Sequence, residues 1–374
     1  MPSGEAKLLQ LNRKEMAMEE MSGRFFSNGQ EITQAWWDQD RHDRRVRRAR
    51  TRLDFGMKSL YWLQNRLGLP EGDFAHVILR MADEGSAPFY HVPKVIAKPK
   101  GGTRIIIAPR PELLQIQTRL NRLLQYTFKR PENVFGYRGG SCLDLAKRHV
   151  DWPSTLKFDI KDAFFRIDWL RVRNMLCSHP VFGEPGFSKN VAHWMAILCV
   201  HLSPPAEVYR RFPSISSFLP QGAPTSPICF DLACEDVDRR LAKIARRVGG
   251  IVSRFADNYY FSMPTSRFSP KLERMILCDV SSYGRFPVHK VCTVGQGELC
   301  RILGYNLVDG HVTNTKAFRR KLRGALHVLK TKLDRGLECR EAYSRVKGCM
   351  GFAVNLPVQF QETYDYCESK ISSF

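Results

Sequence analysis

The chain has 374 residues and a formal net charge of +21, because 58 lysines and arginines stand against 37 acidic residues; its pI is about 9.7. Such an excess of positive charge favours a partner with a phosphate backbone. The cysteines number 11, and no Cys-x-x-Cys pair occurs, which argues against a disulfide framework or a zinc site and indicates a reducing compartment. No signal peptide is recognised and the longest apolar runs are far too short for a membrane span, so we expect a cytoplasmic protein with no membrane partner.

Helical spacing and charge mark the two ends of the chain. Residues 1–85 show helix-like spacing, for example at Leu60, Gln64 and Leu67, and carry no chemical motif. Residues 41–52 hold seven arginines and one acidic residue, and residues 316–347 hold eleven lysines and arginines against three acidic residues. Both basic runs could be solvated faces. Their places near opposite ends of the chain favour contacts along a nucleic-acid track.

A basic hairpin is predicted around the glycine pair Gly101 and Gly102. Lys98 and Lys100 precede the pair and Arg104 follows it. A lysine and an arginine around a glycine turn suit a triphosphate, because arginine makes bidentate contacts and lysine supplies a mobile point charge. The alternative is an exposed basic hairpin without a ligand.

Two aspartates lie at the ends of predicted strands. Asp159 follows the strand-like residues 156–158, and Asp257 lies between the strand-like residues 251–255 and 259–261, at a predicted hairpin tip. Phosphoryl transfer to a nucleotide uses two Mg²⁺ ions, and Mg²⁺ prefers oxygen ligands, so a few carboxylates on rigid strand ends suffice. Each aspartate alone is more often a turn former or a helix cap.

Four further runs complete the pattern, at residues 133–141, 219–227, 284–291 and 299–305. The second of them reads Leu-Pro-Gln-Gly-Ala-Pro-Thr-Ser-Pro and lies between the two aspartates. Alone, it would most often be a rigid loop. In this order the hairpin, the two aspartates and the four runs resemble the motifs of reverse transcriptases, of the bacterial retron type or a related defence-associated type. The resemblance extends over most of the chain.

The resemblance implies an α+β right-hand polymerase, with fingers, a palm of antiparallel sheet plus helices, and a helical thumb. We expect an N-terminal helical region at 1–85, fingers with the start of the palm at 86–155, the palm at 156–306 and the thumb at 307–374. An apolar stripe of helical period supports the thumb prediction and consists of Phe318, Leu322, Leu326, Leu329 and Leu333. The residues beside this stripe that are expected to face nucleic acid are Arg319, Arg323 and Lys330.

The resemblance also assigns catalytic roles. Asp159 and Asp257 are the expected metal ligands, and the backbone carbonyl of Ile160 and the side chain of Asn258 complete the metal set. Lys290 is the candidate general acid near the leaving pyrophosphate, although a lysine is usually a solvated surface residue.

The expected dNTP-binding residues are Lys98, Lys100, Arg104, Asp162, Phe164 and Gln221. Phe164 stands where reverse transcriptases carry an aromatic steric gate, which leaves no room for a 2′-hydroxyl; the alternative is a core residue at a helix start. Gln221 and Gly222 resemble the loop beneath the template and the incoming nucleotide, where glycine permits close backbone approach. Gly304 belongs to a segment that resembles the turn gripping the primer strand.

Two departures from the family pattern stand out. The family has two successive aspartates at the hairpin, whereas this chain has Asp257 and Asn258. An amide oxygen can ligate a hard cation but brings no charge, so metal affinity should fall. Retron enzymes also carry an Asn-Ala pair followed by a histidine; here His149 matches, but Leu145 replaces the asparagine before Ala146.

These observations predict an RNA-directed DNA polymerase that copies a dedicated noncoding RNA into DNA by two-metal phosphoryl transfer, in anti-phage defence. The expected cofactor is a pair of Mg²⁺ ions, with Mn²⁺ as a substitute, and the expected partners are the RNA template, its DNA product, dNTPs and an effector protein. One alternative is a defence-associated reverse transcriptase that makes repetitive, protein-primed or template-independent DNA. Another is a catalytically weak palm that serves as an RNA-binding assembly protein.

Overall fold

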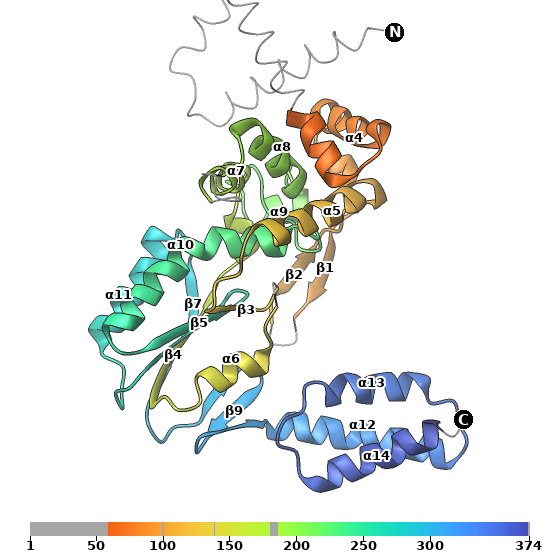
Figure 1. Ribbon diagram of the computed structural model, residues 1–374, viewed down its shortest axis with the longest axis vertical. Helices are drawn as coiled ribbons and strands as arrows, with labels where there is room; N and C mark the ends of the chain where they lie inside the picture. Colours follow the sequence, from red (N-terminus) through yellow and green to blue (C-terminus); the bar gives the residue numbers. More distant parts are fainter. Residues whose placement is uncertain (1–58, 99–100, 138, 180–185, 373–374) are drawn as a thin grey trace, which may run out of the picture. The chain divides into compact units, whose positions relative to one another are not determined.

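The computed structural model (Figure 1) describes residues 59–98, 101–137, 139–179 and 186–372. They form two compact units, each built from two stretches of the chain. The first unit combines the described residues up to 129 with 162–235, and the second combines 130–161 with the described residues from 236 onward. The arginine-rich residues 41–52 and Lys100 lie outside the described residues. The four contiguous domain ranges remain a prediction.

The first unit contains an antiparallel hairpin and a set of packed helices. Strands β1 (Lys94–Ala97) and β2 (Thr103–Ile106) pair with Ala97 opposite Thr103, which confirms the predicted basic hairpin. Residues 59–67 are helical. The other helices of this unit are α4 (Glu71–Glu84), α5 (Pro111–Thr127), α7 (Trp169–Ser178), α8 (Lys189–Cys199) and α9 (Ala206–Tyr209), with 3₁₀ turns at Ala87–Phe89 and Ala163–Arg166.

Helix α5 shows why these segments are helical. Pro111 occupies the first turn, where its missing N–H costs nothing. Leu113, Ile116, Leu120 and Leu124 recur on one face and are each at most 2% exposed, so the helix buries one apolar stripe. That buried stripe anchors the helix in the core of the first unit.

The second unit is organised around a five-stranded sheet of order β3-β5-β6-β4-β7. All of its neighbouring strands are antiparallel except the short parallel pair β3 and β5. The strands are β3 (Val134–Phe135), β4 (Ser154–Ile160), β5 (Ile251–Phe255), β6 (Asn258–Met263) and β7 (Val288–Val294). The predicted class, α+β with an antiparallel sheet plus helices, is confirmed.

The two faces of this sheet are covered by different helices. Phe158 and Tyr259 stack at 5.0 Å between ring centroids, and the Tyr259 hydroxyl donates to Asp238 of α10 (Ser226–Arg247), so α10 covers the face on which these rings project. Tyr260 projects to the opposite face, because side chains alternate along a strand, and there it joins an apolar cluster with Leu145 of α6 (Cys142–Arg148). On the α10 side, α11 (Pro270–Cys278) continues into a π-helical turn at Asp279–Tyr283.

The chain ends in a small sheet and three helices. The small sheet has the order β10-β9-β8 and consists of β8 (Cys300–Ile302), β9 (Tyr305–Val308) and β10 (His311–Asn314). Leu322, Leu326, Leu329 and Leu333 form the buried stripe of α12, as the periodicity predicted. They share a core with α13 and α14. The helices are α12 (Lys316–Asp334), α13 (Arg340–Met350) and α14 (Val358–Ser372), drawn in blue in Figure 1.

Two chemical expectations can be compared with these elements. The 11 cysteines, all within the described part of the chain, are free thiols. No helix among residues 59–372, apart from the short gaps, is both long and apolar enough to cross a membrane.

Candidate active site

The turn between β5 and β6 presents Asp257. The hairpin pairs Phe255 with Asn258, which leaves Ala256 and Asp257 as the turn and confirms the predicted hairpin. Ala256 adopts a left-handed conformation with φ of 54°. The carbonyl of Asp257 accepts a 2.9 Å hydrogen bond from the backbone N–H of Ile160, which fastens the turn to the end of β4.

Asp159 lies in the middle of the sheet, between two neighbouring strands. Its register partners are Asn258 on β6 and His289 on β7. Its Oδ2 lies 3.0 Å from Nε2 of His289 and 2.5 Å from Nζ of Lys290. Its Oδ1 is buried and has no hydrogen-bond partner among the described residues. One oxygen of this carboxylate is therefore paired with cationic or ring nitrogen groups, and the other is available to a ligand.

A β-bulge explains how two consecutive residues reach the same carboxylate. The register of β4 with β7 shifts between Lys157 and Asp159, so that β7 has an additional residue at this point. Lys290 occupies the bulge with φ of 53°. In a regular strand His289 and Lys290 would point to opposite faces, whereas the bulge turns both side chains toward Asp159.

The electrostatics of the two aspartates suit a divalent cation. Burial, followed by the charge of Asp159, raises the pKa of Asp257 to about 6. Nδ2 of Asn258 donates to Oδ1 of Asp257 at 3.0 Å, which adds a dipole but no charge. Because burial and the Asp159 charge both disfavour the ionised form of Asp257, and because Oδ1 of Asp159 is unpartnered, these residues fit a divalent metal. Among the described residues no group of three or more His, Cys, Asp or Glu side chains comes together as a metal site, and the residue beside Asp257 is the uncharged Asn258.

A buried ion pair supports the turn from the α10 side, and the sequence did not predict it. Arg254 and Asp238 are each 1% exposed, and the guanidinium makes several hydrogen bonds to the carboxylate, the shortest at 2.8 Å. Tyr259 adds a 2.8 Å hydrogen bond to the same carboxylate. Nη1 of Arg254 also donates to the carbonyl of Ala256 at 3.0 Å, so the buried cation holds the turn that carries Asp257.

Among the predicted nucleotide-binding residues of the first unit, Asp162 is paired with an arginine that no motif indicated. Asp162 has a left-handed backbone and forms an ion pair with Arg211. Nη1 of Arg211 also donates to the carbonyl of Thr103 at 3.3 Å, next to the exposed Arg104 on β2. Lys98 lies just after β1, and its backbone N–H donates to Gly102 at 2.9 Å.

Phe164, Gln221 and Gly222 lie close together in the same unit. The Phe164 carbonyl accepts a hydrogen bond from Leu219 at 3.2 Å, and its half-buried ring stacks on Phe230 at 5.4 Å. The Gln221 carbonyl accepts a 2.8 Å hydrogen bond from Ile107, just beyond β2. Gly222 has φ of 119°, and a Cβ there would lie 3.3 Å from the Ile107 carbonyl oxygen, so the loop needs glycine to approach the hairpin.

The C-terminal predictions fall on the small sheet and α12. Gly304 has φ of 90° in the β8–β9 turn, and a Cβ there would lie 3.2 Å from the ring of Phe352. Arg319 is half-buried. The guanidinium of Arg323 lies 5.5 Å from the Phe360 ring centroid, and the ammonium of Lys330 lies 5.1 Å from that of Tyr366. Both cations therefore lie over rings of α14, although their side chains remain exposed.

The central part of the sequence identifies the family of the chain. The family described as "Reverse transcriptase (RNA-dependent DNA polymerase)" matches residues 96–307, which is more than half of the chain. The chain belongs to this family. The described helices and antiparallel sheets are consistent with the right-hand polymerase fold of this family, as predicted.

The similar curated proteins include two bacterial retron enzymes. The Retron Mx65 reverse transcriptase of Myxococcus xanthus is 32% identical over 178 residues, which cover 46% of this chain and 40% of that protein. The Retron Mx162 reverse transcriptase of the same organism is 28% identical over 190 residues, covering 50% and 38%. The chain thus spans about two fifths of the length of these relatives. A solved structure of a foamy viral protease-reverse transcriptase in complex with double-stranded DNA aligns with a TM-score of 0.41 and 15% identity, over 81% of this chain and 44% of that chain.

Proposed function

We propose that this protein is an RNA-directed DNA polymerase whose metal-binding carboxylates are Asp159 and Asp257. The observation that carries the proposal is the unpartnered, buried Oδ1 of Asp159 beside Asp257, whose pKa is raised to about 6 by burial and by the Asp159 charge. The two carboxylates are electrostatically more favourable with a divalent cation bound between them than in the metal-free protein. Family membership supplies the reaction class, and the described geometry supports the choice of residues.

In this proposal the site would hold a pair of Mg²⁺ ions, for which Mn²⁺ can substitute; when bound, they would supply activation of the attacking hydroxyl and neutralisation of the triphosphate charge. Asp159 and Asp257 hold the ions, together with the carbonyl of Ile160 and the side chain of Asn258. Lys290 supplies the proton that the leaving pyrophosphate takes up. Its ammonium contacts Asp159, and its side chain is 69% exposed, so it can exchange protons with solvent between turnovers.

The dNTP-binding side of the proposal rests on the first unit. Lys98, Lys100 and Arg104 bind the triphosphate. Asp162 helps to position these three side chains, because Arg211 pairs with Asp162 and also donates to the Thr103 carbonyl on β2. Phe164 excludes a 2′-hydroxyl. Gln221 and Gly222 support the template and the incoming nucleotide, and Gly304, Arg319, Arg323 and Lys330 contact the nucleic acid that leaves the site.

The template in this proposal is a dedicated noncoding RNA, and the setting is anti-phage defence with an effector protein. This part rests on the likeness to the two Myxococcus retron reverse transcriptases. Sequencing of the nucleic acid that co-purifies with the protein tests it. A single abundant RNA–DNA species is expected, and a mixture of cellular RNAs without attached DNA would contradict it.

Primer extension on an RNA template, with dNTPs and Mg²⁺, tests the polymerase itself. We expect Asp159→Ala and Asp257→Ala each to lower the rate on the order of a thousandfold, because a charge that stabilises the transition state is lost. Asp151→Ala is the matched control, since Asp151 is an exposed carboxylate in a turn of the same unit. Wild-type activity in either active-site variant, with the control unchanged, would reject the proposed site.

One observation favours a second candidate function. Asn258 brings an amide where the family has a carboxylate, and its Nδ2 hydrogen-bonds to Asp257. A palm with weakened metal binding would act as an RNA-binding assembly protein. No incorporation by the wild type with Mg²⁺ or Mn²⁺, together with tight RNA binding, would favour this second function over the first.

A further inference from the structure

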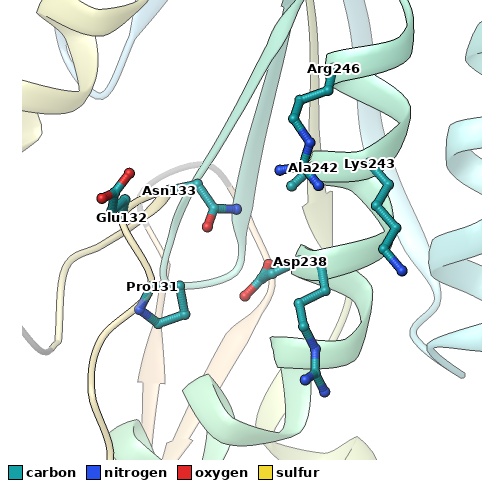
Figure 2. Close-up of a pocket in the computed structure, with 8 residues that line it drawn as sticks. Pro131, Glu132, Asn133, Asp238, Ala242, Lys243 and Arg246 are labelled. Carbon is teal, nitrogen blue, oxygen red and sulfur yellow. The ribbon is translucent and has the colours of Figure 1, made fainter.

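A basic hollow lies on the α10 side of the sheet, where no predicted site residue is found. Figure 2 shows it between the loop at residues 131–133, just before β3, and the second half of α10. Its volume is about 330 Å³, and a smaller hollow of about 240 Å³ adjoins it and shares Glu132, Asn133, Ala242 and Arg246. We call the two together the α10 furrow; its polar and charged lining residues are Glu132, Asn133, Arg148, Asp238, Arg239, Lys243 and Arg246.

The furrow and the Asp159 carboxylate lie on opposite sides of the sheet. Phe158 and Tyr259 project toward α10, and Tyr259 donates to Asp238 at the base of the furrow. Asp159, the neighbour of Phe158 on β4, projects to the other face. A ligand in the furrow therefore leaves the Asp159 carboxylate accessible.

The charges of the furrow form a row along one helix face. Arg239, Lys243 and Arg246 recur at helical spacing, and all three are exposed. Arg239 is paired with Asp236, whereas within the described chain Lys243 and Arg246 have no carboxylate partner. The rise between Arg239 and Lys243 is about 6 Å along the helix axis, which is comparable to the spacing of neighbouring phosphates on a strand.

The wall opposite α10 adds hydrogen-bond donors. Nδ2 of Asn133 is buried and has no hydrogen-bond partner among the described residues. Figure 2 shows this amide directed toward α10. The loop itself is fixed, because the Asn133 carbonyl accepts a 2.8 Å hydrogen bond from the Arg254 backbone. Arg148 holds the Glu132 carbonyl at 3.1 Å and adds a cation to the smaller hollow.

We propose that the α10 furrow binds the phosphodiester backbone of RNA, at a surface separate from the polymerase site. Cations in a row, with an unsatisfied amide donor facing them, fit successive phosphate oxygens. No aromatic side chain lines either hollow, so bases have no stacking platform there and recognition is by backbone and independent of sequence. For the same reason a free mononucleotide finds too few contacts. At one end of the furrow the negative charge of Glu132 repels phosphate. The RNA strand therefore runs along α10.

Neutralisation of the furrow tests the proposal without the need for polymerase activity. The test variant combines Lys243→Gln with Arg246→Gln, and the matched control combines Lys271→Gln with Arg274→Gln, two exposed cations on α11. The probe is a fluorescein-labelled oligouridylate, titrated over a range of salt concentrations without metal or dNTPs. Loss of two phosphate contacts should reduce the steepness of the plot of log binding constant against log salt concentration by about 1.4. It should also weaken binding on the order of tenfold at moderate salt.

A second pair of variants keeps the cations of α10 and changes only the side chain of Asn133. Asn133→Asp places a negative charge toward α10 and should weaken oligouridylate binding, whereas Asn133→Ala, which removes a single hydrogen bond, should have a smaller effect. This pair is decisive if the double glutamine variant melts early. Labelled polyglutamate, used as a second probe, separates RNA from an acidic protein partner.

The outcomes are distinct. Weaker RNA binding and a shallower slope in the furrow variants, with the α11 control at wild-type values, support the proposal. Equal affinity and slope in furrow and control variants overturn it, and so does loss of polyglutamate binding with RNA binding retained. Because every measurement is made without dNTPs, and can be repeated in Asp257→Ala, failure of the polymerase proposal would leave this result unaffected.

Discussion

Lys290 places its ammonium 2.5 Å from Oδ2 of Asp159, although the sheet register pairs Asp159 with His289. The contact exists because the β-bulge adds a residue to β7 and because Lys290 takes a left-handed conformation there. A non-glycine residue in this conformation stores strain of about 1–3 kcal/mol, and such strain concentrates at functional positions.

Replacement of this lysine should lower turnover more than substrate binding. We expect Lys290→Ala to reduce kcat by about a hundredfold, because a positioned proton donor is lost. The KM for dNTP should change little, and Lys290→Arg should recover part of the rate because it restores the cation. Single-turnover and steady-state primer extension measure both quantities. A large rise in KM with unchanged kcat would make Lys290 a substrate-binding residue instead.

Asn258→Asp should lower the Mg²⁺ concentration required for half-maximal synthesis. The added carboxylate supplies the charge that the amide lacks. A Mg²⁺ titration of wild type, Asn258→Asp and Asn258→Ala measures the effect, with the alanine variant expected to require the most metal. Equal requirements in all three proteins would show that residue 258 does not reach the ion.

The ring of Phe164 should govern sugar choice, whereas its neighbour should govern stability. Phe164→Ala is expected to admit ribonucleotides while it retains deoxynucleotide use, because only a half-buried ring is removed. Phe165 is 5% exposed, stacks on Phe212 and packs in a tilted arrangement against Phe218, so Phe165→Ala should cost about 3–5 kcal/mol of folding free energy. Incorporation assays with rNTPs and dNTPs, beside thermal melts, separate the two effects. An unchanged preference in a folded Phe164→Ala protein would assign this ring to the core.

Without metal, Asp257 should destabilise the protein at neutral pH. Burial and the charge of Asp159 raise its pKa to about 6, so the folded state prefers the protonated carboxyl. The stabilisation that comes from protonated Asp257 is complete below the pKa that this carboxyl has in the unfolded chain, and it is lost as pH rises through about 6. Asp257→Asn should therefore raise Tm in the presence of chelator at pH 7–8, and the gain should shrink toward pH 5. A pH-independent difference, or a fall in Tm, would contradict this electrostatic origin.

Local patterns in the sequence were enough to predict many of these elements. The two strand-like runs on either side of Asp257 predicted the β5–β6 hairpin, the glycine pair predicted the β1–β2 hairpin, and the leucine stripe of α12 predicted its buried face. These features depend on neighbours a few residues apart, so a single sequence contains the required information.

Long-range contacts could not be predicted in the same way. Arg254 reads as an ordinary strand residue, and only the docking of α10 supplies Asp238 as its partner. Arg211 lies in no recognised motif, yet it joins Asp162 to the β2 backbone. The bulge at Lys290 depends on a register shift between β4 and β7, which is set by pairing across the sheet. In each case the signal lies in the tertiary arrangement and not in the spacing along the chain.

The Arg254–Asp238 pair makes the support of the proposed metal site depend on the packing of α10 against the sheet. Its guanidinium fixes the Ala256 carbonyl from inside the protein, and its own partner arrives only when α10 packs on the sheet. A chain in which β5 and β6 have paired but α10 has not docked therefore has an unsupported Asp257 turn. During synthesis, Asp238, Arg254 and Ala256 must all have emerged before this support can form, so a shorter nascent chain would lack the contacts that hold the Asp257 turn.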